Sequence, residues 1–202
     1  MIWLRVAQGV LCAVEICGLY YLLQVFFDKR SNKAWSNILW FLSGVLLWGL
    51  TVYHRETVAM YSRYYMLFCI VLATIFSMCF YKIRLTKCLL ISILYFESIY
   101  FIDLLFGYLG QTLFFVNEFI DKIQFSITIE RITVMLMCRT IVIGILLFCV
   151  RQKNKVQGIF IKYQVIFAGF VILEYLGLFS CERIFYPVIR DDRKTDIVLA
   201  MF

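Results

Sequence analysis

The sequence predicts an all-α fold, a polytopic bundle of transmembrane helices with six spans and an incomplete seventh. Hydrophobic residues make up 63% of the 202 residues, the mean hydropathy is +0.88, and there is one proline. Soluble domains contain about 45 to 50% apolar residues. The apolar runs are also continuous over about the 20 residues that a helix needs to cross a bilayer, whereas the strands of a membrane barrel would alternate.

The apolar runs define the spans in order. The first run contains Arg5, but it is too long for a signal-peptide core and ends without a small-residue cleavage site, so we expect it to remain as a helix. No linker or low-complexity tract separates the runs, which indicates a single integral membrane domain over 1–202. The expected spans are residues 6–27, 36–53, 60–81, 88–110, 132–150 and 158–180.

The connections between the spans alternate in charge, and this predicts the orientation. Residues 28–33 carry a net charge of +2, residues 82–87 and 151–155 carry +3 each, and residues 111–131 carry −1. Basic connections stay on the cytoplasmic side. We therefore expect a multi-pass protein of the cell membrane with its N-terminus outside. Basic residues in short clusters between apolar runs also favour membrane lipid as a partner over nucleic acid.

The outer connection 111–131 does not have the pattern of an ordinary polar loop. Glu118 and Lys122 are four residues apart, as in a helical ion pair. We expect an amphipathic helix that lies in the outer interface or lengthens the fifth span, and an extended helix end with no role of its own is the alternative. The apolar residues that recur at helical spacing are Val116, Phe119, Ile120, Ile123 and Ile127.

Residues 181–202 form the expected outer tail. The tail ends in IVLAMF (197–202), which resembles the start of a seventh helix. Six residues rise only about 9 Å, far less than a bilayer core of roughly 30 Å. Two explanations stay open, a segment that lies at the interface and a chain that is a truncated version of a longer one.

Five ionisable residues lie deep within the apolar runs. A charged side chain near the bilayer centre costs about 2.5 to 3.5 kcal/mol, so these groups should face the bundle interior and have partners. One arginine cannot neutralise four acids, and the surplus predicts protonation, water, or a bound cation or ligand. The candidates for ligand binding or coupling are Glu15, Glu97, Asp103, Arg139 and Glu174.

Glu97 and Asp103 are six residues apart, which separates them by about 240° around a helix, so we expect them to face different neighbours. Arg139 is expected to pair with one of the two, because consecutive antiparallel helices usually pack side by side. Asp103 lies nearer the outside and is the stronger functional candidate. The acids then serve either a polar cavity that binds a ligand or carries an ion, or interhelical hydrogen bonds alone.

The sequence shows no catalytic signature. It has no nucleotide-binding loop and no zinc-protease motif, so we expect no enzyme activity, no cofactor and no metal site in this chain. The eight cysteines fall almost entirely within the apolar runs and are interpreted as packing residues. The one histidine, His54, is expected in a solvated loop, and together with Arg55 and Glu118 it is a candidate for contacts at the outer face.

The order of these features resembles the membrane sensor of accessory-gene-regulator-type (AgrC-like) histidine kinases, members of the GHKL superfamily in Gram-positive bacteria. The resemblance covers about residues 1–180. It rests on the external N-terminus, the closely spaced helices with short basic inner loops, and a fourth span that reads KCLLISILYFESIYFIDLLFGYL. It implies a quorum-sensing receptor of a two-component system that senses a secreted peptide, truncated before its kinase module.

Two other classes of protein stay open. A small transporter or substrate-capture subunit would also use six helices with a central acidic cavity, although no broken helix supports it. A structural membrane subunit would only assemble with partners. The expected partners are membrane lipid, an extracellular peptide ligand and a second copy of the chain in a homodimer.

Overall fold

The computed structural model of the chain describes residues 2–31, 33–57, 60, 62–114, 119–153 and 155, and five positions further on, 166, 169, 172, 173 and 176. Within these ranges the chain is α-helical apart from short connections and one isolated bridge between Lys29 and Tyr81. The helices with continuous bounds are α1 (Ile2–Phe26), α2 (Ala34–Thr57), α3 (Arg63–Phe80), α4 (Leu85–Phe114), α5 (Phe119–Phe125) and α6 (Ile129–Arg151).

The helical architecture expected from the sequence is confirmed for the described residues. Four of the described helices, α1, α2, α4 and α6, are long and apolar enough to cross a membrane, and α3 contains a shorter apolar stretch, Tyr65–Phe80. Each of the first five expected spans coincides with one of these helices. The sixth expected span falls outside the described residues except at a few helical positions, and the tail 181–202 lies outside them entirely.

Several helix boundaries differ from those expected by a few residues, and two of the differences bring an arginine into the bundle. α2 continues to Thr57 instead of ending at residue 53, and so includes Arg55. α6 begins at Ile129 instead of residue 132, and so includes Arg131. The early start of α6 has a local cause, because the side chain of Thr128 caps the helix by accepting a hydrogen bond from the Arg131 backbone N–H at 3.3 Å.

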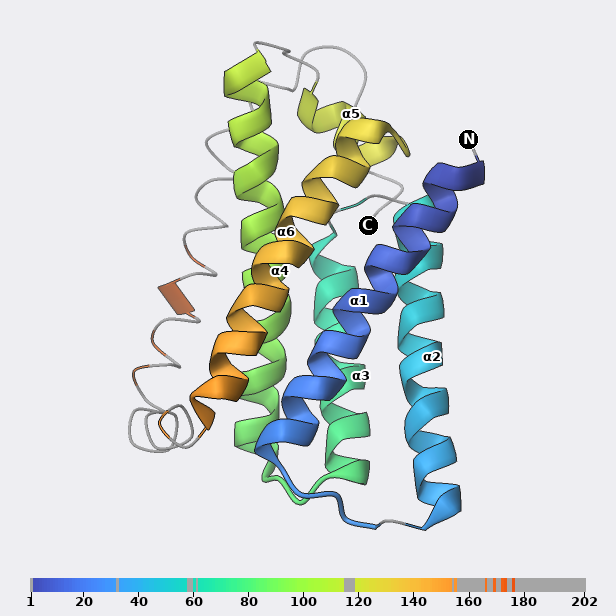
Figure 1. Ribbon diagram of the computed structural model, residues 1–202, viewed down its shortest axis with the longest axis vertical. Coiled ribbons are helices and arrows are strands. Elements are labelled where there is room, and N and C mark those ends of the chain that lie inside the picture. Colours follow the sequence, from blue (N-terminus) through green and yellow to red (C-terminus); the bar gives the residue numbers. More distant parts are fainter. Residues whose placement is uncertain are drawn as a thin grey trace.

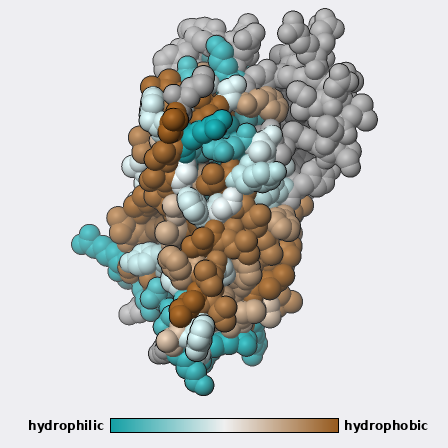
Figure 2. Space-filling view, turned by 90° about the vertical axis from the view of Figure 1, so that its right-hand side faces the viewer, coloured by the Kyte–Doolittle hydropathy of each residue, from teal (hydrophilic) through white to brown (hydrophobic). Residues whose placement is uncertain are grey.

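The helices alternate in direction, so the connections gather at two ends of the bundle (Figure 1). The start of α1, the end of α2 and α5 lie at the upper end. The α1–α2 connection, the α3–α4 connection and the end of α6 lie at the lower end. The three basic segments 28–33, 82–87 and 151–155 therefore share one end. Hydrophobic side chains cover the middle of the face seen in Figure 2, and hydrophilic ones gather at its lower end.

The lower end is a compact junction between two connections. The backbone N–H of Arg30 donates to the Phe80 carbonyl, and that of Lys82 to the Asp28 carbonyl, both at 2.9 Å. Tyr81 is fully buried beneath them, and its hydroxyl accepts a hydrogen bond from Trp40 Nε1 at 2.9 Å. These bonds hold the lower ends of α1, α2, α3 and α4 in register.

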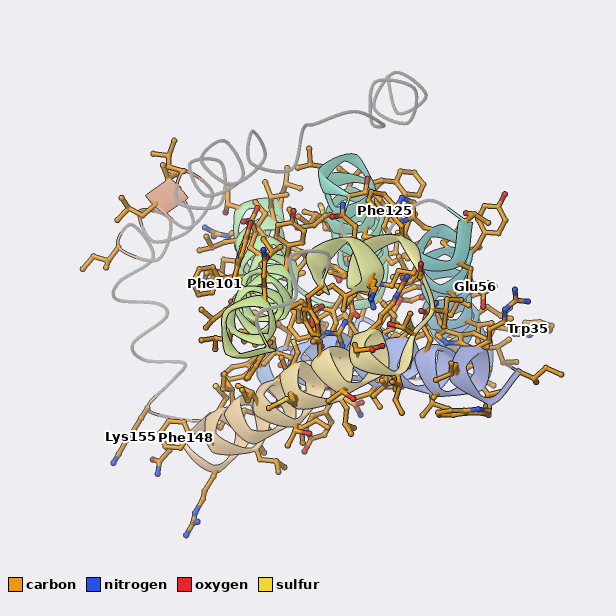
Figure 3. The ribbon with its side chains drawn as sticks, turned by 90° about the horizontal axis from the view of Figure 1, so that it is seen from above. Trp35, Glu56, Phe101, Phe125, Phe148 and Lys155 are labelled. Carbon is orange, nitrogen blue, oxygen red and sulfur yellow. The ribbon has the colours of Figure 1, made fainter. Side chains whose placement is uncertain are left out.

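At the upper end, α5 packs against α4. Phe119 and Ile123 of α5 are buried in a cluster that also contains Leu104 of α4 and Met135 of α6, whereas Lys122 is exposed. The α5 helix lies across the end of the bundle when the molecule is seen from above (Figure 3). The amphipathic helix expected in the outer connection is thus present at Phe119–Phe125, while Val116 and Glu118 lie outside the described residues.

The contact between α5 and α4 depends on two glycines. A Cβ atom at Gly110 would clash with Cε1 of the Phe119 ring, and one at Gly107 would lie 2.9 Å from Cδ1 of Ile123. An aromatic ring is stiff, so the Gly110 contact leaves no room for a methyl group. Glycine at this position is what lets the two helices approach.

We predict that Gly110→Ala loosens α5. The added methyl group overlaps the Phe119 ring, and overpacking of this kind costs about 1 to 3 kcal/mol. Amide hydrogen exchange of residues 119–125 should become about fivefold faster or more. Gly144→Ala in α6 is the matched control, because nothing lies within 4 Å of its added Cβ atom. Equal exchange in the two variants would contradict the docking role of Gly110.

Candidate functional site

The central polar feature of the bundle is an arginine held between two carboxylates. Arg139 of α6 donates Nη1 to both carboxylate oxygens of Asp103 in α4, at 2.6 and 2.7 Å. Its Nη2 donates to Oε2 of Glu15 in α1 at 2.7 Å. Exposure is 3% for Glu15 and 1% for the other two side chains. Of the two pairings expected for Arg139, the one with Asp103 is confirmed.

A second arginine shares Glu15. Arg55 of α2 is 9% exposed, and its Nη1 lies 2.9 Å from Glu15 Oε2 while its Nη2 donates to Oε1 at 3.3 Å. The four side chains form an alternating series, Asp103, Arg139, Glu15 and Arg55, that joins α4, α6, α1 and α2. Each charge in this ion-pair series has an opposite charge beside it, which offsets part of the cost of removing it from water.

Further hydrogen bonds fix the backbones that carry the ion-pair series. The Tyr95 hydroxyl of α4 donates to the backbone carbonyl of Glu15 at 2.6 Å. Arg131 of α6, 1% exposed, donates Nη2 to the backbone carbonyl of Arg55 at 2.7 Å. The first bond sets α4 against the middle of α1, and the second sets the start of α6 against the end of α2. The charged atoms are thereby held at fixed depths.

Helical spacing explains why these side chains point inward. Glu15 shares the buried face of α1 with Gln8, Cys12 and Leu19, at intervals of three or four residues. In α2 the buried residues recur every four positions and end at Arg55, and they are Ser43, Leu47, Thr51 and Arg55. Each charged residue therefore continues an apolar or weakly polar face of its own helix.

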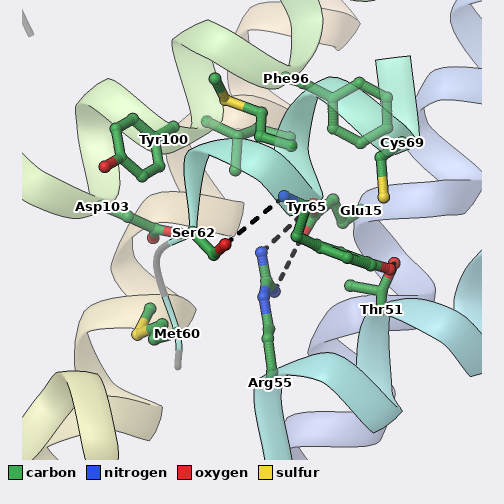
Figure 4. Close-up of a pocket in the computed structure, with 12 residues that line it drawn as sticks. Glu15, Thr51, Arg55, Met60, Ser62, Tyr65, Cys69, Phe96, Tyr100 and Asp103 are labelled. Carbon is green, nitrogen blue, oxygen red and sulfur yellow. Dashed lines mark hydrogen bonds and ion pairs between the residues drawn. The ribbon is translucent and has the colours of Figure 1, made fainter. Parts of the chain in front are cut away.

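A small cavity lies beside the ion-pair series (Figure 4). Its volume is about 40 Å³, and its lining includes Glu15, Arg55 and Asp103 together with Thr51 and Tyr65. The Tyr65 hydroxyl donates to Thr51 Oγ1 at 3.2 Å. A buried water needs about 10 to 15 Å³ of such volume, so the cavity has room for on the order of three water molecules.

The surplus of buried acid expected from the sequence is wrong for the described residues. The buried acids there are Glu15, Glu97 and Asp103, and the buried arginines are Arg55, Arg131 and Arg139, so the two kinds of residue are equal in number. Two of the arginines had been assigned to connections, and the helix extensions described above bring them inside. For Glu15 and Asp103 the geometry therefore supplies the counter-charge that the sequence interpretation assigned to a proton, a cation or a ligand.

The outer-face candidates are placed differently from expectation. Arg55 is buried in the ion-pair series and does not lie at the surface. His54 is part of α2 and not of a solvated loop, because it is half-buried and its ring stacks on Tyr65 with the centroids 4.0 Å apart. The third candidate, Glu118, lies outside the described residues, and so does Glu174 among the membrane acids.

Glu97 is 2% exposed and lies about 240° around α4 from Asp103, so it faces a different neighbour.

Sequence reasoning missed two polar residues of this region. Arg131 was counted as a loop charge, although it precedes Arg139 by eight residues, about two helical turns, on the same face. Gln8 is fully buried, and its amide has no hydrogen-bond partner among the described residues.

Comparison with known proteins does not extend this picture. No protein-family model, no curated protein and no solved structure matches the chain. Among the described residues, no group of three or more His, Cys, Asp or Glu side chains is arranged to hold a metal ion. The arguments on function therefore rest on the ion-pair series and the helices that carry it.

We predict that Asp103→Asn destabilises the bundle by about 3 to 5 kcal/mol, because it removes one partner of a buried ion pair. Arg139 then keeps only the carboxylate of Glu15, which it shares with Arg55. The double variant Asp103→Asn with Arg139→Gln restores charge balance and keeps the Glu15–Arg55 pair. Its destabilisation should be smaller than the sum of the single variants by about 1 to 3 kcal/mol.

Unfolding of the purified chain in detergent, followed by circular dichroism, measures these differences. Arg151→Gln is the control on the same helix, since Arg151 is exposed and its removal should change stability by less than about 0.5 kcal/mol. Additive effects of the two single variants would show that the Asp103–Arg139 pair is not energetically coupled.

Proposed function

We propose that the chain is a membrane-embedded sensor domain that binds an extracellular signal at the end carrying α5 and transmits it by repacking of the helices. The observation that carries the proposal is the ion-pair series, which joins α1, α2, α4 and α6 beneath α5. The resemblance to peptide-sensing histidine kinases favours a secreted peptide as the signal.

The proposed coupling route starts at α5. Gly107, on which Ile123 of α5 packs, follows Asp103 by four residues, about one turn of α4. A ligand that shifts α5 therefore acts one turn away from a carboxylate that holds Arg139. At the other end of the ion-pair series, Arg55 donates Nη2 to Glu15 Oε1 at 3.3 Å, the longest hydrogen bond in the series. We propose that this contact opens at the lowest cost in free energy. A ligand drives such a change only if it binds the two arrangements with different affinity.

A structural membrane subunit is the second candidate. The equal number of buried acids and arginines favours it, because a balanced group of ion pairs needs no ligand to complete it. No observation among the described residues favours the transporter, since the cavity beside the ion-pair series has room for only a few waters.

The proposed orientation places the lower, basic end in the cytoplasm. Fluorescent-protein fusions after Lys33, Lys87 and Lys155 should then fluoresce, and alkaline-phosphatase fusions at these sites should be inactive, because positively charged connections stay inside. A phosphatase fusion after Lys194 should be active if a sixth span crosses the membrane. The reverse pattern would place the α5 end in the cytoplasm and end the proposal of an external signal.

We predict that a peptide fraction from spent medium of the organism that carries the gene changes hydrogen exchange in the chain held in lipid nanodiscs. Protection should change at residues 119–125, where the ligand binds, and at residues 135–142 of α6, where the ion pair lies. In Asp103→Asn the change in α6 should be lost while the change in α5 persists, because the coupling acts through the carboxylate.

The control variant for this experiment is Arg151→Gln, which should respond as the wild type does. A structural subunit would show no change in either segment, and that result would reject the sensor. Accumulation of a solute in proteoliposomes, without any change in α5, would support the transporter instead.

A further inference from the structure

An apolar groove runs along the outside of the bundle between α1, α2 and α6. Its volume is about 720 Å³, within the range of roughly 300 to 1,000 Å³ that ligand pockets occupy. Its lining is apolar apart from a few polar groups, and includes Ala13, Cys17, Tyr21, Trp40, Gly44 and Leu147. Since α1, α2 and α6 are all candidate membrane spans, the groove lies at membrane depth.

Small side chains create the groove. Ala13 and Cys17 of α1 and Gly44 of α2 leave a gap where larger residues would fill the space between the helices. A Cβ atom at Gly44 would meet the Tyr20 ring at 3.8 Å, an ordinary contact, so this position accepts a side chain without a clash. Toward the α5 end, Trp48 closes the gap by donating Nε1 to the Gly9 carbonyl at 2.8 Å. The groove therefore extends from there toward the basic end.

The basic end of the groove meets a fixed cation. Trp40 lines the groove, and Lys29 Nζ lies 4.3 Å from the centroid of its ring. The position of this lysine is held by a hydrogen bond from Nζ to Asn37 Oδ1 at 3.3 Å, and the ring is held by its bond to Tyr81. Arg30 is anchored beside it, since its Nε donates to the Tyr81 carbonyl at 3.0 Å while the residue stays exposed.

The charge around this end is strongly positive. In the described parts of residues 27–33, 81–87 and 151–155 there are nine lysines and arginines, and Asp28 is the one acid. One of these nine, Arg151, follows the groove residue Leu147 by one turn of α6 and is exposed. An anionic lipid has an apolar acyl chain and a negatively charged headgroup. An apolar groove at membrane depth that ends at fixed cations is complementary to both parts.

We propose that this groove binds an anionic phospholipid of the leaflet at the basic end, with an acyl chain between α1, α2 and α6 and the phosphate at Lys29 and Arg30. Charge complementarity favours an anionic lipid over a second copy of the chain as the occupant of the groove. A second copy would bring its own nine cations to the same end, where they would repel those already present. Trp40 has the place expected of an aromatic residue at the membrane interface. This proposal goes beyond the sensor function and does not depend on it.

The test measures the lipid that stays bound to the intact chain. The protein is reconstituted in equal amounts of phosphatidylglycerol and phosphatidylcholine, extracted in mild detergent, and analysed by native mass spectrometry. Retained phosphatidylglycerol should exceed phosphatidylcholine in the wild type. Lys29→Gln should lower phosphatidylglycerol retention about fivefold, equal to about 1 kcal/mol for one basic residue near an anionic surface.

Groove-filling variants test the acyl-chain site separately. Gly44→Leu should reduce retained phosphatidylglycerol because its side chain occupies the channel, and Ala13→Leu does the same from α1 if the first variant does not fold. The controls are Gly49→Leu on α2, where nothing lies within 4 Å of an added Cβ atom, and Lys122→Gln on α5 at the opposite end. Both should retain lipid as the wild type does.

Three results would overturn the proposal. Equal retention of the two lipids by the wild type would show that the cations do not select the bound lipid. Equal losses of bound phosphatidylglycerol in Gly44→Leu and Gly49→Leu would show that the lipid does not bind in the groove. Dimers in the mass spectrum that disappear in Gly44→Leu, with no change in bound lipid, would assign the groove to a second copy of the chain.

Discussion

The arrangement of the bundle depends on the burial of Arg139 between Asp103 and Glu15. A guanidinium that loses water and finds no carboxylate is far more costly than any apolar mismatch, so the three residues must meet. They come from α4, α6 and α1. The ion pairs therefore fix how far each of these three helices is shifted along its axis and how it is rotated about that axis. Arg55 extends the same constraint to α2. Four helices are in this way set against one another by charges that occupy a small part of their length.

This constraint matters more in a membrane than it would in water. Lipid chains are as apolar as leucine, so hydrophobic burial gives little direction to helix association, and polar contacts and close packing decide it. α2 shows this most clearly, since only 17% of its apolar window is buried. It is held instead by specific bonds, among them Trp48 to the Gly9 carbonyl at 2.8 Å, Trp40 to Tyr81 at 2.9 Å, and Tyr20 to Ser43 at 2.6 Å.

The helices and the grouping of the basic connections at one end could be predicted from the sequence, because length and hydropathy report directly on both. The pairing of Arg139 with an acid of the fourth span could also be predicted, since consecutive antiparallel helices usually pack together, but the choice of Asp103 over Glu97 could not. Arg55 and Arg131 could not be placed by hydropathy, which ends a span at the first charged cluster. A signal was present in the spacing, because Leu47, Thr51 and Arg55 recur every four residues. The excess of acid was a second signal, since it required further bases inside the bundle.

α1 connects the two proposals through its opposite faces. Gln8, Cys12, Glu15 and Leu19 form the buried face that carries the ion pair, and Ala13, Cys17, Tyr21 and Gln24 on the other side line the groove. A helix with a charged contact on one face and a lipid contact on the other cannot rotate to suit one of them without changing the other. The charge balance of the ion-pair series permits such movement, because contacts can lengthen or exchange without a change in buried net charge. A test of the proposed sensor function therefore has to hold the lipid composition constant.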